Sequence, residues 1–136
     1  MSNKIEFIIP GKVQAKQRPR FNGKFVYTPK ETTNYENWVK ACYLEKYNNE
    51  KLLEAPLEVR IIAFYEIPSS TSKKRKQLML DNKIYPTIKP DTDNIAKSIL
   101  DSLNGIAYKD DKQVVDLRVR KQYAEVPSVS VWIRQV

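Results

Sequence analysis

The sequence predicts an α+β domain in which helices pack on a mixed, mostly antiparallel sheet. Residues 56–68 read PLEVRIIAFYEIP, a long apolar run bounded by prolines that is typical of a strand. Residues 113–123 and 129–136 alternate apolar and polar side chains, as half-buried strands do. Residues 93–104 instead repeat their apolar side chains at helical spacing. The chain shows no internal repeat and no linker, so we expect one domain over residues 1–136.

Four further elements complete the expected set. Residues 4–9 predict a first strand that Pro10-Gly11 ends, and residues 24–28 predict a short strand in a basic, turn-rich segment. Thr28-Pro29-Lys30-Glu31 combines a T-x-x-E capping box with proline at the first helical position, which predicts a helix over residues 29–48. Serine and threonine caps before good helix formers predict a short basic helix in residues 69–80. We expect both tryptophans, Trp38 and Trp132, in the core.

The helix expected over residues 93–104 is strongly two-sided. At roughly 100° per residue its apolar and polar side chains fall in opposite halves of the helix. The apolar half holds Ile95, Ala96, Ile99, Leu100 and Leu103, and the polar half holds Asp93, Asn94, Lys97, Ser98, Asp101, Ser102 and Asn104. Gly105 is well placed to end the helix in the left-handed conformation.

Composition excludes several kinds of chemistry. The 136 residues contain no histidine, so serine–histidine and cysteine–histidine pairs and histidine metal sites are excluded. The lone cysteine, Cys42, excludes an internal disulfide and a multi-cysteine zinc site. No apolar run is long enough to span a bilayer, and the start of the chain lacks a signal-peptide pattern, so we expect a cytoplasmic protein without a membrane partner. Any catalysis must therefore use carboxylates, lysines, tyrosines or a metal held by oxygen.

The formal net charge of +8 is unevenly distributed. Residues 11–30 carry six basic side chains and no acid, and residues 69–90 carry six basic side chains against one aspartate. Residues 91–111 reverse this balance, with five aspartates against two lysines. The basic segments indicate a polyanionic partner such as a phosphate backbone. An acidic island between them would repel the same phosphates unless a cation is bound there.

Two interpretations compete for Asp91 and Asp93. Aspartate is favoured at a helix N-terminus, where it accepts backbone N–H bonds and meets the positive end of the dipole, and spacing alone favours this capping role. The sharper interpretation is a metal site, because a bend from extended chain into helix can turn both carboxylates toward one point. Lys97, four residues after Asp93 on the same face, is either a surface ion-pair partner worth only about 0.3–0.5 kcal/mol or part of that site.

Asp110 and Asp111 by themselves are typical of a solvated turn before the strand at residues 113–123. If the chain folds back after Gly105, the start of this strand returns to the start of the helix, and three or four carboxylates share a small volume. Such crowding would raise their pKa values unless a divalent cation neutralised them. Magnesium suits an oxygen site of this kind, where it would activate water and stabilise phosphate charge, and Lys97 would add a positive charge.

The motif KPDTDNIAKSILDSLNGIAYKDDKQV, residues 89–114, resembles the signature of the RusA family of Holliday-junction resolvases, small magnesium-dependent endonucleases of bacteria and their prophages. The family form has a D-x-D-N start, a lysine four residues after the second aspartate, a helix end like D-x-L-N-G, and then D-D-x-Q-V. The matching positions, in order, are Asp91, Asp93, Asn94, Lys97, Asp101, Leu103, Asn104, Gly105, Asp110, Asp111, Gln113 and Val114. The segments GKVQAKQRPRF and YTPKETTNYENWV also resemble the family's opening, so the similarity covers most of the chain.

The resemblance implies a RusA-like fold and a set of site residues. The family's acidic site matches Asp91, Asp93 and Asp111, and its catalytic lysine matches Lys97. Asp110 and Asp101 match family positions too: Asp110 is the less certain metal ligand, and Asp101 is expected to brace Lys97. The implied ion is Mg²⁺, with Mn²⁺ as an alternative. The implied activity, in recombination and repair, is that of a homodimer cutting opposed strands of four-way junction DNA symmetrically, which suits a two-fold interface.

With a nucleic-acid substrate, the basic segments gain a role as arms that contact phosphates. The candidate DNA-binding residues are Lys16, Arg18, Arg20, Lys73, Lys74, Arg75 and Lys76. The KKRK run could equally be a solvated helix face. Phe21 and Tyr27 either stack on exposed bases or belong to the core. Two other functions stay open: a non-catalytic protein that binds branched DNA, and a nuclease for other branched or single-stranded nucleic acid, RNA included.

Overall fold

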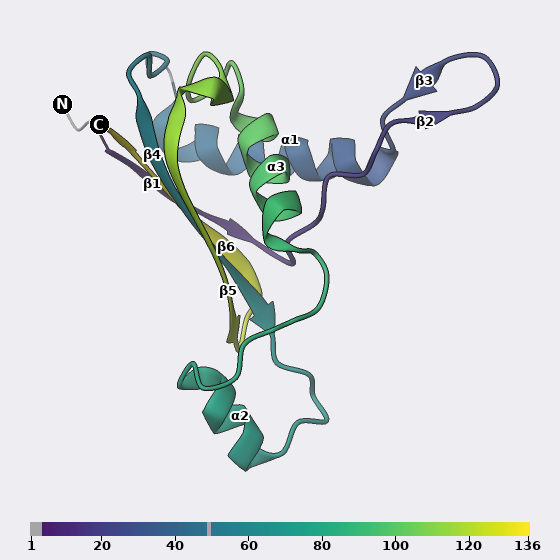
Figure 1. The fold of residues 1–136 in the computed structure, drawn as a ribbon, viewed down its shortest axis with the longest axis vertical. Coiled ribbons are helices and arrows are strands. Elements are labelled where there is room, and N and C mark those ends of the chain that lie inside the picture. Colours follow the sequence, from purple (N-terminus) through teal and green to yellow (C-terminus); the bar gives the residue numbers. More distant parts are fainter. Residues whose placement is uncertain (1–3, 49) are drawn as a thin grey trace.

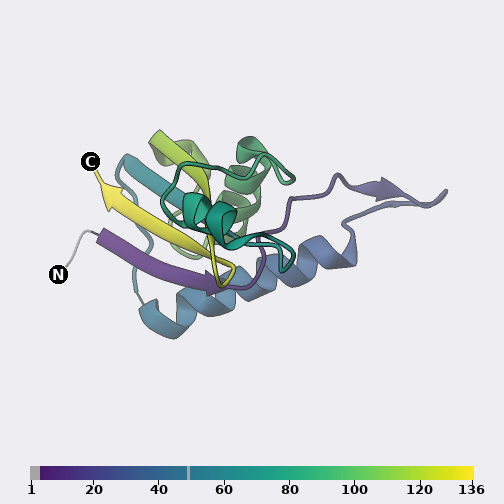
Figure 2. The same cartoon turned by 90° about the horizontal axis from the view of Figure 1, so that it is seen from below.

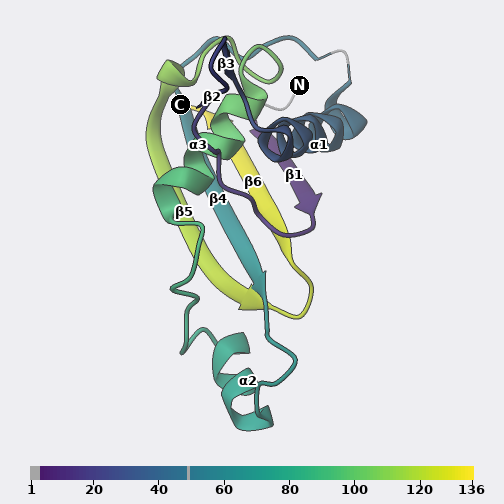
Figure 3. The same ribbon diagram turned by 90° about the vertical axis from the view of Figure 1, so that its right-hand side faces the viewer.

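The computed structural model describes residues 4–48 and 50–136 and confirms the α+β prediction. Two helices, α1 and α3, cover one face of a four-stranded sheet, and the opposite face carries no helix (Figures 1 and 3). A two-stranded hairpin and the short helix α2 project from this body at different ends. Figure 2, seen from below, shows the hairpin extending beyond the N-terminal end of α1.

The elements follow the expected order along the chain. The helices are α1 (Lys30–Tyr47), α2 (Lys73–Leu80), α3 (Thr92–Leu103) and a 3₁₀ turn, η1 (Asp111–Gln113). The strands are β1 (Lys4–Pro10), β2 (Arg20–Phe21), β3 (Val26–Tyr27), β4 (Leu57–Glu66), β5 (Val114–Ala124) and β6 (Ser128–Gln135).

The main sheet is mixed, with strand order β1-β6-β4-β5. β6 pairs antiparallel with both β1 and β4, whereas β4 and β5 pair in parallel. A parallel pair needs a crossover between its strands, and here the crossover contains both α2 and α3. This crossover lays α3 across the sheet and returns the chain to the start of β5 through η1.

The core lies between the helices and the sheet. The apolar half of α3 is buried as predicted, with Ile95, Ile99 and Leu103 fully enclosed. Ser98 and Ser102, predicted on the polar half, are buried as well. From the sheet, alternate β4 side chains meet them, including the buried Val59 and Ile61. Gly105 has φ +73° just past the end of α3, which confirms the predicted left-handed helix end.

Four local predictions were wrong. The helix start lies one residue later than expected: Pro29 occupies the N-cap position of α1, and no side chain caps it. Trp38 is 45% exposed because its indole N–H reaches out of α1 to the Pro10 carbonyl, 2.8 Å away. Val115 and Leu117, expected on a buried face, are exposed because β5 is an edge strand and its pairing with β4 is irregular at Leu57/Glu58. Trp132 is only partly buried, on the uncovered face of the sheet.

The two projecting parts carry the basic segments. β2 and β3 form an exposed hairpin, and α2 lies beyond the far end of β4 and β5 (Figures 1 and 3). The Ser72 side chain caps α2 by accepting from the Arg75 backbone N–H, as the serine-rich start predicted. Among the described residues, no helix is long and apolar enough to cross a lipid bilayer.

We expect Leu103→Ala to lower the free energy of unfolding by about 2–5 kcal/mol, because Leu103 is fully buried and its truncation leaves a cavity under α3. Leu44→Ala, at a position 40% exposed on α1, is the matched control and should cost less than about 1 kcal/mol. Urea denaturation followed by circular dichroism measures both. Equal losses for the two variants would contradict the described packing of α3.

Candidate active site

Helix α3 presents a charged face to solvent. Asp93, Lys97 and Asp101 follow one another at four-residue spacing, so they share the side opposite the buried one. Asp93 and Lys97 are exposed, whereas the Asp101 side chain is only 18% exposed. Because the apolar side chains hold α3 in one orientation, this row of charges is fixed relative to the sheet.

The Asp91 side chain does not act as the capping interpretation requires. Asp91 occupies the N-cap position of α3, but its side chain makes no cap hydrogen bond to the backbone. Instead, its Oδ1 accepts a hydrogen bond from the Asn94 side-chain amide, 2.5 Å away. The Asp93 side chain makes no hydrogen bond or ion pair with any residue in the described part of the chain. Both carboxylates are exposed, and both keep oxygen atoms that face no protein donor.

Asp101 binds two lysines. Its Oδ2 lies 2.8 Å from Lys16 Nζ and 3.7 Å from Lys97 Nζ, so the predicted contact with Lys97 is present. Lys16 also lies 3.9 Å from Glu36 on α1. The hydrogen bond to Asp101 is the main reason that the pKa of Lys16 is raised, so this lysine stays charged. Lys16 was predicted to bind DNA; the structure places it in this ion-pair cluster beside α3.

Asp111 lies at the C-terminal end of α3. Its backbone N–H donates to Asn104 Oδ1 at 2.9 Å, while Asp110 and Gln113 form a capping box that holds η1. Burial, the neighbouring Asp110 and the charge of Asp101 raise the pKa of the Asp111 carboxyl, and Lys97 opposes this rise. The predicted return of this strand to the start of the helix is therefore wrong. η1 stops at the end of the helix because Asn104 binds it there.

The predicted site residues are thus distributed along α3. Asp91 is the N-cap residue of α3 and Asp93 lies in its first turn, whereas Asp111 lies beside its last residue; the helix between rises about 18 Å. Within the described residues, no group of three or more acidic, cysteine or histidine side chains is close enough together to hold a metal ion. The assignment of Asp91, Asp93 and Asp111, with Asp110, to one metal site stays a prediction.

The chemistry of the donors nevertheless fits magnesium. Its protein sites commonly use one or two carboxylates and leave other positions to water and substrate phosphate, so a preassembled three-carboxylate cage is not required. Burial first, and then Asp110 and the charge of Asp101, raise the pKa of Asp111, and a cation beside Asp111 would favour its charged form. At the other end of α3, Asp91 and Asp93 offer exposed oxygens.

A cavity of about 460 Å³ opens beside the start of α3. Asp91 and Asn94 line it together with three lysines, Lys16, Lys89 and Lys121. Gln17 also lines it, and the Gln17 side-chain oxygen is buried without a hydrogen-bond partner in the described structure. Lys16 Nζ is bound to Asp101 and Lys121 Nζ to the Ile88 carbonyl, so Lys89 is the lysine of this lining that has no partner among the described residues.

The other candidate DNA-binding residues lie on the two projections. Arg18 and Arg20 are exposed in the segment that leads into the hairpin, and Phe21 and Tyr27 are exposed within it. The KKRK run forms the first turns of α2, where three of its side chains are exposed and Lys76 pairs with Glu125 at 3.1 Å. Both projections therefore offer unpaired positive charge.

Sequence reasoning missed the contacts that join distant segments. The Lys16–Asp101 pair spans 85 residues, and the Gln17 side chain reaches the cavity from the same loop. Asn104 was expected only as part of the motif, yet it holds η1 through its side chain. A signal for Lys16 existed in the basic opening segment, but charge alone could not tell a phosphate contact from an internal ion pair.

Most of the chain matches a family of DNA-cutting enzymes. The family described as "Endodeoxyribonuclease RusA" matches residues 10–134, nearly the whole chain. The chain is also 36% identical over 137 residues to a protein of Bacillus subtilis (strain 168) named "Uncharacterized protein YqaN", covering 97% of this chain and 96% of that protein. The chain therefore belongs to the RusA endodeoxyribonuclease family.

We expect the pKa of Asp111 in metal-free protein to lie above that of an ordinary aspartate, and Asp101→Asn to lower it, because removing the nearby negative charge makes ionisation of Asp111 easier. Asp116→Asn, an exposed position on β5, is the matched control and should leave it unchanged. Carboxyl-carbon NMR titration measures all three proteins. If the pKa of Asp111 were the same in the wild type and in Asp101→Asn, the two carboxylates would not interact.

Proposed function

We propose that this protein is a magnesium-dependent, structure-selective endodeoxyribonuclease that resolves four-way DNA junctions by paired symmetric nicks during recombination and repair. The observation that carries the proposal is family membership over residues 10–134 together with the charged face of α3. A row of aspartates and a lysine on one exposed helix face, flanked by two basic projections, suits a phosphodiester substrate.

In the proposed reaction, water attacks the phosphorus of one phosphodiester, the bond to one bridging oxygen breaks, and that oxygen takes a proton as it leaves. Lys97 stabilises the negative charge that develops on the phosphate, because its ammonium is exposed on the same face as Asp93. Asp101 holds Lys97 in place from 3.7 Å, and Lys16 offsets part of the charge of Asp101. Asp91 and Asp93 would hold Mg²⁺ at the start of α3, and Asp111, with Asp110 as a further candidate, would hold it at the other end, each end with one or two carboxylates. When bound, the ion supplies charge neutralisation and an activated water.

The two projections supply affinity. In this proposal Arg18 and Arg20 near the hairpin, and Lys73, Lys74 and Arg75 on α2, contact phosphates on opposite sides of the site. The exposed rings of Phe21 and Tyr27 stack on bases that a branch point leaves accessible. A homodimer would place one such site on each of two opposed strands, as a two-fold symmetric junction requires.

One observation favours a second candidate function. No metal-holding group of three acidic side chains is assembled in the described residues, and a protein that binds branched DNA without cutting it needs none. A nuclease for other branched or single-stranded nucleic acid is a narrower variant of the first proposal. Incubating the protein with labelled junctions, forks, single strands and RNA, with and without magnesium, separates all three.

We expect Asp93→Asn to reduce nicking of a synthetic four-way junction in magnesium to background while binding is kept. The amide keeps the size of the side chain but removes the charge that would hold the ion. Asp116→Asn is the matched control and should cut at the wild-type rate. Gel-based cleavage and binding assays measure the two effects. If the Asp93→Asn protein kept full nicking activity, Asp93 would not be a catalytic or metal-binding residue.

We expect the triple variant Lys73→Gln, Lys74→Gln, Arg75→Gln to weaken junction binding and to flatten its salt dependence. Each lost phosphate contact should reduce the slope of log K against log salt by about 0.9, so three lost contacts reduce it by about 2.7. Lys76 is left intact because it already pairs with Glu125.

The control for this triple variant is Lys51→Gln, at an exposed position that precedes β4 at the other end of the sheet. Binding at several salt concentrations measures the slopes. If the slope of log K against log salt were the same in the triple variant and the wild type, the KKRK run would be a solvated helix face that does not contact DNA.

A further inference from the structure

We propose that a cavity adjoining the start of α3 receives one nucleobase of the cleaved strand, and that Glu66 at its rim selects which base enters. The inference rests on the proposed nuclease function and goes further, because it gives the enzyme a means of choosing where along a strand it cuts. It concerns a different cavity from the lysine-lined one beside Asp91.

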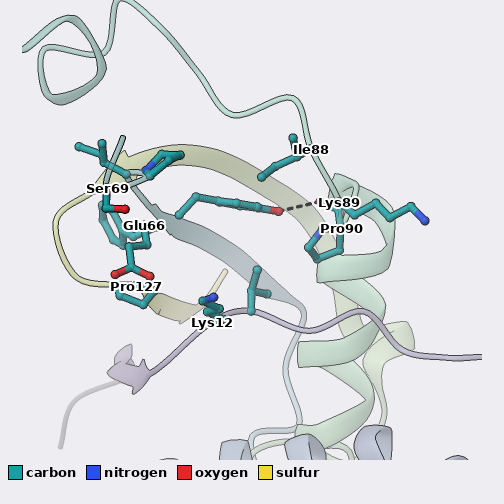
Figure 4. A pocket seen from close by; sticks show the side chains of 12 residues that line it. Lys12, Glu66, Ser69, Ile88, Lys89, Pro90 and Pro127 are labelled. Atoms are coloured by element: carbon teal, nitrogen blue, oxygen red, sulfur yellow. Dashed lines mark hydrogen bonds between the residues drawn. The ribbon is translucent and has the colours of Figure 1, made fainter. Parts of the chain in front are cut away.

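The cavity lies at the end of β4, beyond the region that the helices cover (Figure 4). Its volume of about 420 Å³ is within the range of about 300–1,000 Å³ that small-molecule sites occupy. Its apolar lining includes Val13, Ile67, Ile88 and the prolines Pro68, Pro90 and Pro127. Flat, rigid, apolar walls of this kind suit a planar ring.

Tyr65 gives the cavity a fixed wall. Its hydroxyl donates to the Pro90 carbonyl at 2.7 Å, a bond that Figure 4 draws, and Lys121 Nζ lies 5.2 Å from the centre of its ring. Burial, and then the charge of Asp91, raise the pKa of Tyr65 to about 12, so the hydroxyl keeps its proton and this bond. A ring held from two sides needs little reorganisation when a ligand enters.

The polar groups lie at the rim. Glu66, Ser69 and Lys12 line the cavity beside Pro127, as Figure 4 shows. The Glu66 carboxylate makes no hydrogen bond or ion pair with other described residues, so its oxygens are available as acceptors. An acceptor at this position favours bases with an exocyclic amino group, namely adenine, cytosine and guanine, over thymine.

The position of the cavity points to a nucleotide rather than a free small molecule. The segment Ile88-Lys89-Pro90 lines both this cavity and the lysine-lined cavity beside Asp91, so the two are neighbours. Lys121 connects them: it lines the second cavity, donates to the Ile88 carbonyl at 2.5 Å, and lies over Tyr65. Lys89 is exposed, lines both cavities and has no partner among the described residues, so a phosphate bound to it would bring the attached base to the first cavity.

A branched substrate lowers the free energy needed to move a base from the DNA into the cavity. Taking a base out of a duplex costs a few kcal/mol, and least where the base is already unpaired. Base pairs next to a crossover are less constrained than pairs inside a continuous duplex, so we expect extrusion of a base to cost less there. The cavity would therefore accept a base from a junction more readily than a base from continuous duplex DNA.

The experiment uses the full chain and four-way junctions with one randomised base pair at each position around the crossover. Nicked products formed in magnesium are sequenced, which gives total nicking and the base preference at each position. The variants are Glu66→Gln, which removes the charged acceptor, and Ile88→Trp, which fills the cavity at a residue that is 61% exposed. The matched controls are Glu125→Gln beside α2 and Leu44→Trp on α1, neither of which lines this cavity.

We expect the wild type to prefer one class of base at one position, and Glu66→Gln to reduce that preference by about tenfold. Ile88→Trp should abolish the preference, and both controls should retain it. Wild-type nicking without a base preference, or a preference that both cavity variants retain, would overturn the base pocket and leave the nuclease proposal standing. No nicking of any junction by the wild type would overturn the nuclease proposal and the pocket together.

Discussion

The arrangement of this protein depends on the two-sided burial of α3. Ile95, Ile99 and Leu103 are fully enclosed between α3 and the sheet, and this burial fixes the rotation of the helix about its axis. At that rotation, Asp93 and Lys97 face solvent and Asp101 is turned toward the loop that carries Lys16. Rotating the helix by one residue would bury charge and expose apolar surface, which is strongly unfavourable. The core therefore positions the charged face.

The electrostatics along α3 then follow from which elements approach it. At the C-terminal end, η1 brings Asp111 next to Asp101, and the two lysines that contact Asp101 limit the repulsion. At the N-terminal end, Asp91 lines a cavity together with Lys16, Lys89 and Lys121. A basic protein thus keeps its acidic helix in a lysine-rich setting.

Much of the fold was predictable because it follows from local patterns. The apolar spacing of residues 93–104, the proline-bounded run around β4 and the serine cap of α2 each specify their own element. The errors concern tertiary context: Trp38 reaches a carbonyl on β1, and Val115 lies on an edge strand. The site was predictable only in part. Helical spacing gave the Lys97–Asp101 contact, but the Lys16–Asp101 pair and the binding of η1 by Asn104 join segments whose approach no local pattern encodes.

The central claim is that the charged face of α3 cuts phosphodiesters of branched DNA with the help of a divalent ion. Its most direct measurement titrates magnesium from zero into wild-type protein bound to a labelled four-way junction, and follows binding and nicking together. We expect binding throughout, no nicking at zero magnesium, and symmetric nicks that increase with its concentration until they saturate. Stable binding with no nicking at any magnesium or manganese concentration would contradict the claim and favour a protein that only binds the junction.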